Sequence, residues 1–307
     1  MKNVLLKNTV KCIIRECVKI LHTLKILTPK IIVYMEGGIC SQMKQYVVGQ
    51  IFAEKGYRIE YDIEWFQTNG YDNDRQFVRT FDLIEAFNIK IHYSNKLTNW
   101  LYKKAFMFHG NHLTPTDFTF MIKKPPVYLG GFYELPDKFW LENFANYFCF
   151  VTNSVNIESN KILDKICFND KITCAVHVRR GDLKFYNPYY GSPPNEAYFI
   201  EAVRYLASII NEVEFFFFSD EPQWVNDNLL IHLNDYTCYN SCINDSDKGF
   251  FDLLCISKCN HQIASIGSFG KFGSLLNAYS EKILILRNDP IEYVWKSRHP
   301  RVIIIGE

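Results

Sequence analysis

Two patterns of hydrophobic positions follow one another along the chain. Between Val10 and Lys25, apolar residues recur every three or four positions with basic side chains between them, which predicts an amphipathic helix. Glu214–Phe218 is instead almost wholly apolar, as in a strand that is buried on both faces of a parallel sheet. Because helical and strand patterns keep alternating after residue 30, we expect an α/β fold.

The alternation predicts two Rossmann-like lobes behind the N-terminal helix, with a polar boundary at Thr152 to Lys161. The first lobe opens with a β-α-β unit, and its expected elements are strands at 31–34, 58–62 and 127–129 and a helix at 42–55. The second lobe has expected strands at 173–178, 214–218, 261–266 and 282–286 and helices at 195–210, 250–259 and 274–279. The chain is therefore expected to divide into residues 1–28, 29–158 and 159–307, with a ligand in a cleft that the two lobes face.

The N-terminal helix allows two interpretations. Its apolar face comprises Val10, Ile13, Ile14, Cys17, Leu21 and Leu24. Its opposite face comprises Lys11, Arg15, Lys19 and His22. A basic amphipathic helix can rest on anionic lipid, so residues 1–27 are a candidate for peripheral contact with the inner membrane. The same pattern also suits a helix that docks on its own lobe and turns a solvated basic face outward.

Charge and composition narrow the classes of function. The net charge is +1, but residues 1–30 hold seven basic side chains and one acidic one, so the rest is acidic on balance. Nucleic-acid binding needs a second basic surface besides this one terminal segment, and the sequence does not predict one. No apolar run reaches the ~20 residues of a membrane helix, and no signal-peptide pattern opens the chain. We expect a cytoplasmic protein with no nucleic-acid partner.

Ten cysteines without an export signal are expected to be reduced thiols. The spacings Cys238-x3-Cys242 and Cys255-x3-Cys259 could hold zinc, although paired zinc ligands more often lie two residues apart. Cys255 and Cys259 also lie one helical turn apart in an apolar run, where cysteine packs as a small hydrophobic residue. We therefore favour buried thiols and expect no metal.

Polar residues follow the first strand of the second lobe, where it opens into a loop. In the run from His177 to Asp182, alternation puts His177 and Arg179 on one side of the strand and Val178 and Arg180 on the other. Guanidinium groups bind phosphate oxygens in a bidentate manner, and Asp182 could orient one of them. A structural ion pair at a sheet edge is the alternative. Two arginines, a histidine and a glycine turn together favour a phosphate site.

Two more strand ends carry candidate chemistry. Gly267–Ser274 is expected to be a turn whose glycines let the backbone approach a phosphate, or simply pack tightly. Ser219 and Asp220 are expected to cap the helix that Pro222 begins. The sequence has no nucleophile elbow, zinc-protease motif or Walker A motif, and the D-x-D triplet at 245–247 lies in a polar loop. The residues thus predict a phosphorylated ligand held by arginines rather than by a metal.

The segment 177–182 resembles the H-x-R-R-G-D signature of bacterial α-1,2-fucosyltransferases, glycosyltransferase family 11. Four other segments resemble blocks of the same family, and the five blocks occur in the family's order. Gly37–Tyr46 is similar to G-G-L-G-N-Q-M-F-Q-Y, Tyr128–Tyr133 to Y-L-x-G-Y-x, Phe218–Glu221 to F-S-D-D, and Asp252–Cys259 to D-L-x-x-M-S-x-C. The resemblance runs from about Tyr34 to the end of the chain.

This resemblance implies a GT-B-like architecture and an inverting, metal-independent transfer of L-fucose. The donor would be GDP-L-fucose, bound by the C-terminal lobe, and no cofactor is implied. The acceptor would be the 2-hydroxyl of a terminal β-galactoside, on a galactose-terminated oligosaccharide or lipid-linked glycan of the O-antigen or lipopolysaccharide type. Arg179 would be the catalytic residue, because it holds the β-phosphate as that group leaves.

The resemblance also implies the other residues at the donor. His177 and Asp252 would contact the guanosine, and Ser268 and Phe269 would lie at the diphosphate. Arg180 would belong to the same site, and Asp182 would fix the loop. The turn containing Gly37, Gly38 and Gln42 would face the donor phosphate and the acceptor galactose.

The chain departs from the family pattern in the segment Gly37–Tyr46 and in the segment Gly267–Gly273. Cys40 and Ser41 replace a glycine and an asparagine, and Lys271-Phe272 replaces a pair of tryptophans. The alternatives are the same fold with another linkage or GDP-sugar, or a degenerate homologue that binds a glycan or a partner without turnover. The intact signature at 177–182 favours the enzyme.

Overall fold

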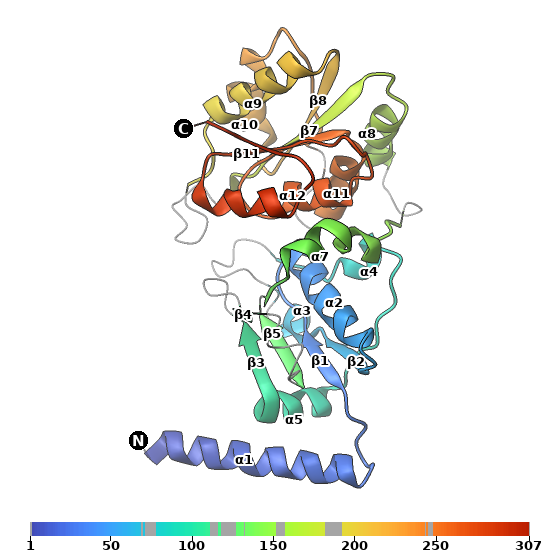
Figure 1. Cartoon of the computed structure of the whole chain (residues 1–307), viewed down its shortest axis with the longest axis vertical. Coiled ribbons are helices and arrows are strands. Elements are labelled where there is room, and N and C mark those ends of the chain that lie inside the picture. Colours follow the sequence, from blue (N-terminus) through green and yellow to red (C-terminus); the bar gives the residue numbers. More distant parts are fainter. Residues whose placement is uncertain are drawn as a thin grey trace. The chain divides into compact units, whose positions relative to one another are not determined.

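The computed structural model describes residues 2–68, 70, 78–110, 116–117, 127–131, 133–151, 157–181, 192–242, 244 and 248–306 (Figure 1). These residues form two compact units. Unit 1 comprises Met1–Leu83 and Ile89–Pro136, and unit 2 comprises Ile84–Asn88 and Asp137–Glu307. The units thus divide at Pro136 rather than at the polar stretch near residue 158, and the N-terminal helix belongs to unit 1.

Unit 1 is built on a parallel four-stranded sheet in the order β2-β1-β5-β3. Its strands are β1 (Ile31–Tyr34), β2 (Ile59–Asp62), β3 (Met107–Gly110) and β5 (Tyr128–Gly131), beside a short pair, β4 (Thr116–Asp117) and β6 (Tyr133–Glu134). Its helices are α1 (Lys2–Thr23), α2 (Ile39–Ala53), α3 (Glu64–Thr68) and α5 (Lys96–Phe106), while α4 (Leu83–Ala86) lies where the chain passes into unit 2. The predicted β-α-β opening is confirmed.

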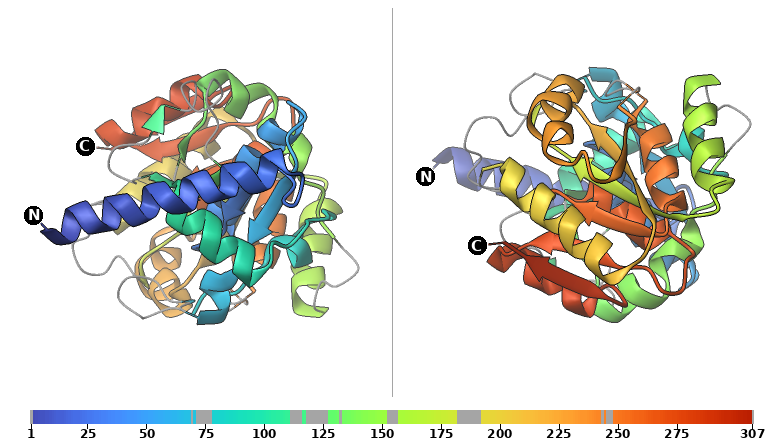
Figure 2. Two further views of the ribbon diagram at one scale, coloured as in Figure 1. Left: turned by 90° about the horizontal axis from the view of Figure 1, so that it is seen from below. Right: turned by 90° about the horizontal axis from the view of Figure 1, so that it is seen from above.

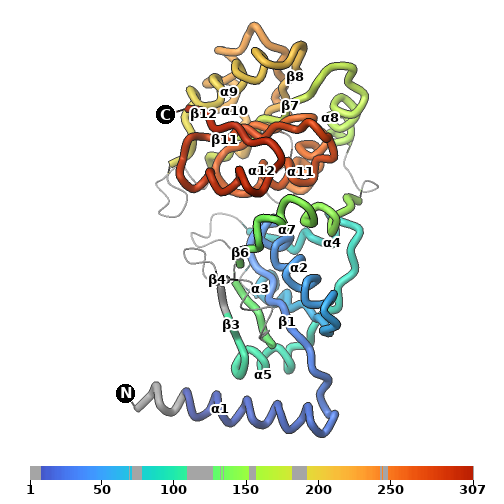
Figure 3. Tube along the Cα trace, viewed as in Figure 1, coloured from blue at the N-terminus to red at the C-terminus, as the bar shows by residue number. Residues whose placement is uncertain are grey.

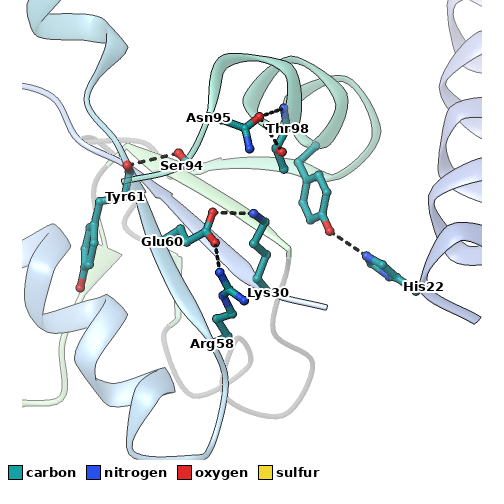
Figure 4. Close-up of polar contacts among 9 residues, drawn as sticks. His22, Lys30, Arg58, Glu60, Tyr61, Ser94, Asn95 and Thr98 are labelled. Carbon is teal, nitrogen blue, oxygen red and sulfur yellow. Dashed lines mark hydrogen bonds and ion pairs between the residues drawn. The ribbon is translucent and has the colours of Figure 1, made fainter. Parts of the chain in front are cut away.

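Two carboxylates are buried in this sheet, and each has polar partners. Glu60 on β2 accepts hydrogen bonds from Lys30 Nζ and from Arg58 Nη2, the latter at 3.0 Å (Figure 4). Asp62, at the end of the same strand, accepts from the hydroxyl of Tyr128 at 2.7 Å. Buried carboxylates need such partners because an uncompensated charge in the interior costs several kcal/mol.

Helix α1 packs on unit 1 through a face that differs from the predicted one. Val18 is fully buried, whereas the helix pattern places it outside the predicted apolar face. Arg15 Nη2 donates to the carbonyl of Ala105 at 3.2 Å. His22 Nε2 lies 2.7 Å from the hydroxyl of Tyr102 (Figure 4). The prediction that Arg15 and His22 turn away from the buried face is wrong, because α5 offers them a carbonyl of its last turn and a hydroxyl.

Unit 2 is built on a parallel six-stranded sheet in the order β12-β11-β10-β7-β8-β9. Its strands are β7 (Ile172–Val178), β8 (Val213–Ser219), β9 (Thr237–Asn240), β10 (His261–Ala264), β11 (Leu284–Arg287) and β12 (Val302–Ile305), the last of which is labelled in Figure 3. Its α-helices are α7 (Asp137–Glu142), α8 (Ile157–Cys167), α9 (Glu196–Ile209), α10 (Pro222–Asn228), α11 (Gly249–Lys258) and α12 (Phe269–Leu276). Its described part also contains the 3₁₀ helices η1 (Phe144–Tyr147), η3 (Leu230–His232) and η4 (Pro290–Ser297).

Strand β8 is buried on both faces, as its apolar sequence predicts. Phe215 and Phe217 join the core under α9 and α10, whereas Phe216 and Phe218 join the core under α8 and α11. Figure 2 shows these two helical layers on either side of the sheet. Helices thus cover both faces of β8, while β7 and β9 pair with its two edges.

The cysteines of this lobe pack as the helical interpretation predicts. Cys255 on α11 and Cys259 just after it are buried beside Ile166 and Phe216. Burial raises the pKa of both thiols well above its usual range, so they stay protonated. Among the described residues, no group of three or more histidine, cysteine, aspartate or glutamate side chains is arranged to hold a metal ion.

Contacts of α7 explain why the boundary between the units falls before Asp137. Asp137 accepts a hydrogen bond from Arg298 Nε at 2.8 Å, 161 positions along the chain. The ring of Trp140 lies 5.6 Å from that of Phe272 and 6.2 Å from that of Trp295. These contacts join α7 to α12 and η4, which a change of local polarity does not show.

Candidate active site

The candidate site lies at the carboxyl edge of the sheet in unit 2, where β7 and β10 end side by side. His177 on β7 pairs with Ala264 on β10, and the amide of Ser265 donates to the carbonyl of His177 at 3.0 Å. Ser265 Oγ also donates to the carbonyl of Arg179 at 3.4 Å. Ser265 thus holds the backbone on both sides of the last residue of β7. Ligands of open parallel sheets bind at this edge of the sheet.

The two arginines that follow β7 lie on opposite sides of it, as the alternation predicts. Arg179 lies against Gly267, where a Cβ atom would overlap Arg179 Nη1, and Gly267 has a φ of +88°. Arg180 turns to the other side, with its Cζ 3.8 Å from the ring centroid of Trp224 and its Nε 3.6 Å from Glu221 Oε2. Glycine is therefore required at 267 both for its backbone conformation and for the approach of the guanidinium.

Most of the glycine-rich segment is helix, so the turn predicted at 267–274 is wrong in its extent. Only Gly267 and Ser268 precede α12, and Ser268 is its N-cap residue without a side-chain cap. A Cβ at Gly270 would lie 2.9 Å from His177 Cβ, and one at Gly273 would overlap the side chain of Ile256. Both glycines let α12 approach β7 and α11 closely. This role cannot be predicted from the sequence pattern, in which clustered glycines indicate a turn.

His177 is a buried, neutral imidazole. Its ring centroid lies 5.2 Å from that of Phe269, the first residue of α12. Burial lowers the pKa of His177 to about 3, and the nearby charges of Arg179 and Lys271 act in the same direction. Its Nδ1 atom finds no hydrogen-bond partner among the described residues. Such an orphaned polar atom at a sheet edge suits a hydrogen bond with a ligand.

Asp252 supplies a buried carboxyl group on α11. Its Oδ1 accepts a hydrogen bond from Asn244 Nδ2, and Asn244 Nδ2 also lies 3.1 Å from Ser159 Oγ. Burial raises the pKa of Asp252 to about 7, and the hydrogen bond from Asn244 offsets only part of this effect. At the start of the same helix, a Cβ at Gly249 would lie 3.9 Å from the ring of Phe269. Phe269 thus lies between His177 and the start of α11.

Lys271, which replaces an aromatic residue of the family pattern, is buried with a partner of opposite charge. Its ammonium group forms an ion pair with Glu292 on η4, and both side chains are almost completely buried. The neighbouring Phe272 packs on Phe144 and Trp140. The interior of unit 2 therefore accommodates this departure, because Glu292 compensates the introduced charge.

Asp220 holds the arginine loop from the neighbouring strand. Its Oδ1 accepts from the amide of Arg180 at 2.9 Å, and its Oδ2 accepts from the amide of Gly181 at 2.8 Å. Asp220 follows β8, whose last residue, Ser219, pairs with Val178. The expectation that Asp220 caps α10 is wrong, since the N-cap of that helix is Glu221 and no side chain caps it.

The glycine turn in unit 1 is tied down from inside. Gln42 is fully buried, and its Nε2 donates to the carbonyls of Gly37 and Thr80 at 3.0 and 2.9 Å. Its Oε1 accepts from the amides of residues 82 and 83. Gln42 therefore shapes the turn rather than lying open to a ligand. Gly37 has a φ of +80°, and a Cβ at Gly38 would lie 3.9 Å from the guanidinium of Arg79.

Asp182 and the D-x-D triplet at 245–247 lie outside the described residues, so the predicted role of Asp182 stays a prediction. The structure brings His177, Arg179 and Phe269 together at one sheet edge and separates Arg180 from them. The sequence analysis did not identify the loop-holding role of Asp220, although the position of this residue directly after the strand next to β7 was an available signal.

These features define the class of protein: an α/β protein with two parallel-sheet units, whose second sheet carries an arginine and a neutral histidine at its carboxyl edge. The sequence profile of Glycosyl transferase family 11 matches residues 11–294. The chain belongs to this family, which confirms the resemblance seen in the sequence, and its two parallel-sheet units are the GT-B-like pair of lobes that the sequence predicts.

Individual relatives are distant. The O-antigen biosynthesis glycosyltransferase WbnK of Escherichia coli is 24% identical over 289 residues, which cover 82% of this chain and 91% of WbnK. An alpha-1,2-colitosyltransferase of Escherichia coli is 27% identical over 146 residues, covering 44% of this chain and 46% of its own. A solved structure of POFUT1 in complex with GDP-fucose matches 91% of this chain and 99% of its own, at 12% identity and a TM-score of 0.49.

No helix in the described part of the chain is both long enough and apolar enough to cross a lipid bilayer.

Proposed function

We propose that the chain transfers L-fucose from GDP-L-fucose to the 2-hydroxyl of a terminal β-galactoside, with inversion at the anomeric carbon. The observation that carries the proposal is the placement of Arg179 beside Gly267 and the neutral His177 at the carboxyl edge of β7. Membership of glycosyltransferase family 11 supports it.

In the proposed reaction the acceptor oxygen attacks the anomeric carbon of fucose. The bond from that carbon to the β-phosphate oxygen breaks, GDP leaves, and the acceptor hydroxyl loses its proton. Arg179 stabilises the negative charge that develops on the leaving diphosphate, an interaction that strengthens in the transition state. Because the guanidinium compensates this negative charge, we propose that no metal ion is needed. The proposal assigns no general base.

The neighbouring side chains would hold the nucleotide. His177 is neutral at physiological pH, so Nδ1 can form a hydrogen bond without repelling Arg179. Asp252, when ionised, can accept from the N–H groups on the edge of guanine, which present two adjacent donors. Ser268 and Phe269 form the start of α12, beside His177, where the diphosphate would approach.

The proposed acceptor is a galactose-terminated oligosaccharide or lipid-linked glycan of the bacterial surface. WbnK, with which most of the chain aligns, is named for O-antigen biosynthesis. A lipid-linked acceptor would lie at the inner membrane. We therefore propose a cytoplasmic enzyme that contacts this membrane peripherally through residues 1–27.

A second candidate keeps the fold and changes the donor sugar or the linkage. The similarity to an alpha-1,2-colitosyltransferase favours it, because that relative is named for a different sugar. Residues that contact the sugar and the acceptor need not lie in the shared segments.

Isothermal titration calorimetry in EDTA tests the proposal directly. GDP, GDP-L-fucose, GDP-mannose and UDP-sugars would be titrated into the whole protein. We expect GDP-L-fucose to bind without metal and UDP-sugars to bind far more weakly. Tight binding of another GDP-sugar would replace fucose by that sugar. Binding of no nucleotide sugar would favour the homologue that lacks turnover.

A further inference from the structure

A cavity of about 240 Å³ opens at the amino edge of the sheet in unit 2. Its lining includes Ile172 and His261, the first residues of β7 and β10, and Ile209, the last residue of α9. The candidate active site lies at the carboxyl edge of the same sheet. Because β7 has seven residues, the two edges lie about 20 Å apart. The cavity is therefore separate from the candidate active site.

His261 is a neutral side chain beside this cavity and is only 3% exposed. It lies on the same face of β10 as Ile263, which belongs to the core under α9. Its Nδ1 atom accepts a hydrogen bond from the amide of Ile283 at 3.1 Å, so the neutral ring carries its proton on Nε2. Burial lowers the pKa of His261 to about 4, and the described residues offer Nε2 no acceptor. A buried N–H group without a partner suits a hydrogen bond with a ligand.

Three more polar side chains line the cavity nearer to solvent: Tyr279, Glu281 and Arg301. The ring centroid of Tyr279 lies 5.6 Å from that of His261, with the two rings nearly perpendicular. Glu281 and Arg301 are exposed, and neither forms an ion pair within the described part of the chain. A ligand with one net charge would be attracted by one of these two groups and repelled by the other. A neutral ligand that carries both donors and acceptors avoids this conflict.

The size and the walls of the cavity narrow the class of ligand further. Its volume is below the ~300–1,000 Å³ of pockets for drug-sized molecules, so it suits a single ring. The isoleucines Ile172, Ile209 and Ile283 add apolar surface to its lining. A monosaccharide meets both conditions, because its hydroxyl groups donate and accept hydrogen bonds while its C–H groups can pack on isoleucine and tyrosine side chains.

We propose that this cavity binds a neutral monosaccharide, either free or as one residue of a glycan. His261 and Arg301 donate hydrogen bonds to its hydroxyl oxygens, and Glu281 accepts one from a hydroxyl group. The ring of Tyr279 packs on its C–H groups. Binding here requires neither GDP-L-fucose nor Arg179, so this proposal does not depend on the proposed transfer reaction and the two can fail separately.

Saturation-transfer difference NMR of the full chain tests the proposal with D-glucose, D-galactose, L-fucose and their methyl glycosides. We expect at least one of the free sugars to receive saturation from the wild-type protein. Arg301→Ala and Tyr279→Ala should each weaken its binding about fivefold or more, because the first loses a charged donor and the second loses an aromatic ring. A methyl glycoside that binds equally well would identify a glycan residue as the ligand, and one that does not bind would identify the free sugar.

The matched control is Arg204→Ala, since Arg204 is an exposed arginine on α9 that does not line the cavity. This variant should bind the sugar like the wild type, and circular dichroism should show that all variants remain folded. Saturating GDP should leave the sugar signal unchanged. Absence of any sugar signal, displacement of the sugar by GDP, or unchanged binding by both cavity variants would overturn the proposal. Binding of free alanine in preference to every sugar would assign the cavity to a zwitterion and would overturn it as well.

Discussion

Two adjacent arginines have different surroundings because the residues of a strand alternate between its faces. Arg179 shares the side of His177 and meets Gly267, while Arg180 packs on Trp224 of α10. Both were expected at the donor from the family resemblance. In the structure, only Arg179 of these two approaches the glycine turn. Arg180 instead lies over the ring of Trp224, and this cation–π contact stabilises its position.

Replacing each arginine by alanine should therefore have different effects. Arg179→Ala is expected to lower kcat by about 10²–10³, because an interaction that strengthens in the transition state is lost. Arg180→Ala should lower kcat about tenfold or less and should mainly reduce stability, by about 1 kcal/mol. Steady-state kinetics and urea denaturation of both variants check this. Equal losses of kcat would contradict the separation of the two side chains.

Asp252 should make stability depend on pH. Its pKa of about 7 in the folded protein lies above its ordinary value of 3.8, so the folded state holds more protons than the unfolded state between these values. The free energy of unfolding should then fall as the pH rises from about 4 to about 7. Asp252→Asn should remove this part of the slope.

Urea denaturation across that pH range measures the effect, with Asp227→Asn as a control on the exposed face of α10. A slope that Asp252→Asn leaves unchanged would show that another group titrates. The same ionisation should strengthen the binding of GDP as the pH rises through about 7, because guanine N–H groups need the carboxylate form. His177, with a pKa of about 3, stays neutral throughout this range.

At the scale of elements, the site depends on how the ends of neighbouring strands hold one loop. Asp220 after β8 binds two consecutive amides after β7, and Ser265 after β10 binds the carbonyl of Arg179. The loop is thus fixed from both flanking strands. Such support keeps a catalytic group near its productive geometry at little entropic cost during the reaction.

Asp220→Asn should lower kcat about tenfold to a hundredfold while changing the KM for the donor less. The amide retains one acceptor oxygen but opposes a second backbone N–H with its own N–H group. Because Asp220 is expected to act through Arg179, adding Asp220→Asn to Arg179→Ala should cause little further loss. Kinetics of the double variant measure this, with Asp227→Asn again as the control. Fully additive losses would indicate an independent role for Asp220.

At the scale of the whole molecule, the chain enters unit 2 twice. Residues 84–88 lie within the sequence of unit 1 and yet pack in unit 2. Phe87 is fully buried, with its ring 4.8 Å from that of Phe148 and 4.7 Å from that of Phe150. Backbone hydrogen bonds from Asn88 to Cys149 and from Val151 to Ala86 hold the two passages together.

Phe87→Ala should therefore destabilise unit 2 by about 3–5 kcal/mol, the usual cost of removing a buried phenylalanine. Hydrogen exchange should locate the loss of protection in segments 137–151 rather than in β1 and β2. Ile84→Ala, at a side chain that is 40% exposed, serves as the control and should have little effect. A loss of protection confined to unit 1 would contradict the division of the chain.

The sequence by itself determined the elements whose signals are local. Helix α9 occupies Glu196–Ile209, within one residue of the predicted ends, because Asn195 caps it through the amide of Tyr198. Strands β1 and β8 follow from their apolar runs, and the order of the five family segments identified the family. These signals act over a few residues, so they can be read without knowing what packs against them.

Only the tertiary structure decided how distant segments use the same residue types. It placed Gly270 and Gly273 inside a helix, gave Asp220 to a loop 40 positions away and joined Asp137 to Arg298. It also showed that α1 docks through Val18 and leaves Val10, Ile13 and Leu24 of the predicted apolar face exposed. The physical reason is that close packing, ion pairs and carboxylate–amide hydrogen bonds depend on neighbours in space, which periodicity along the chain does not specify.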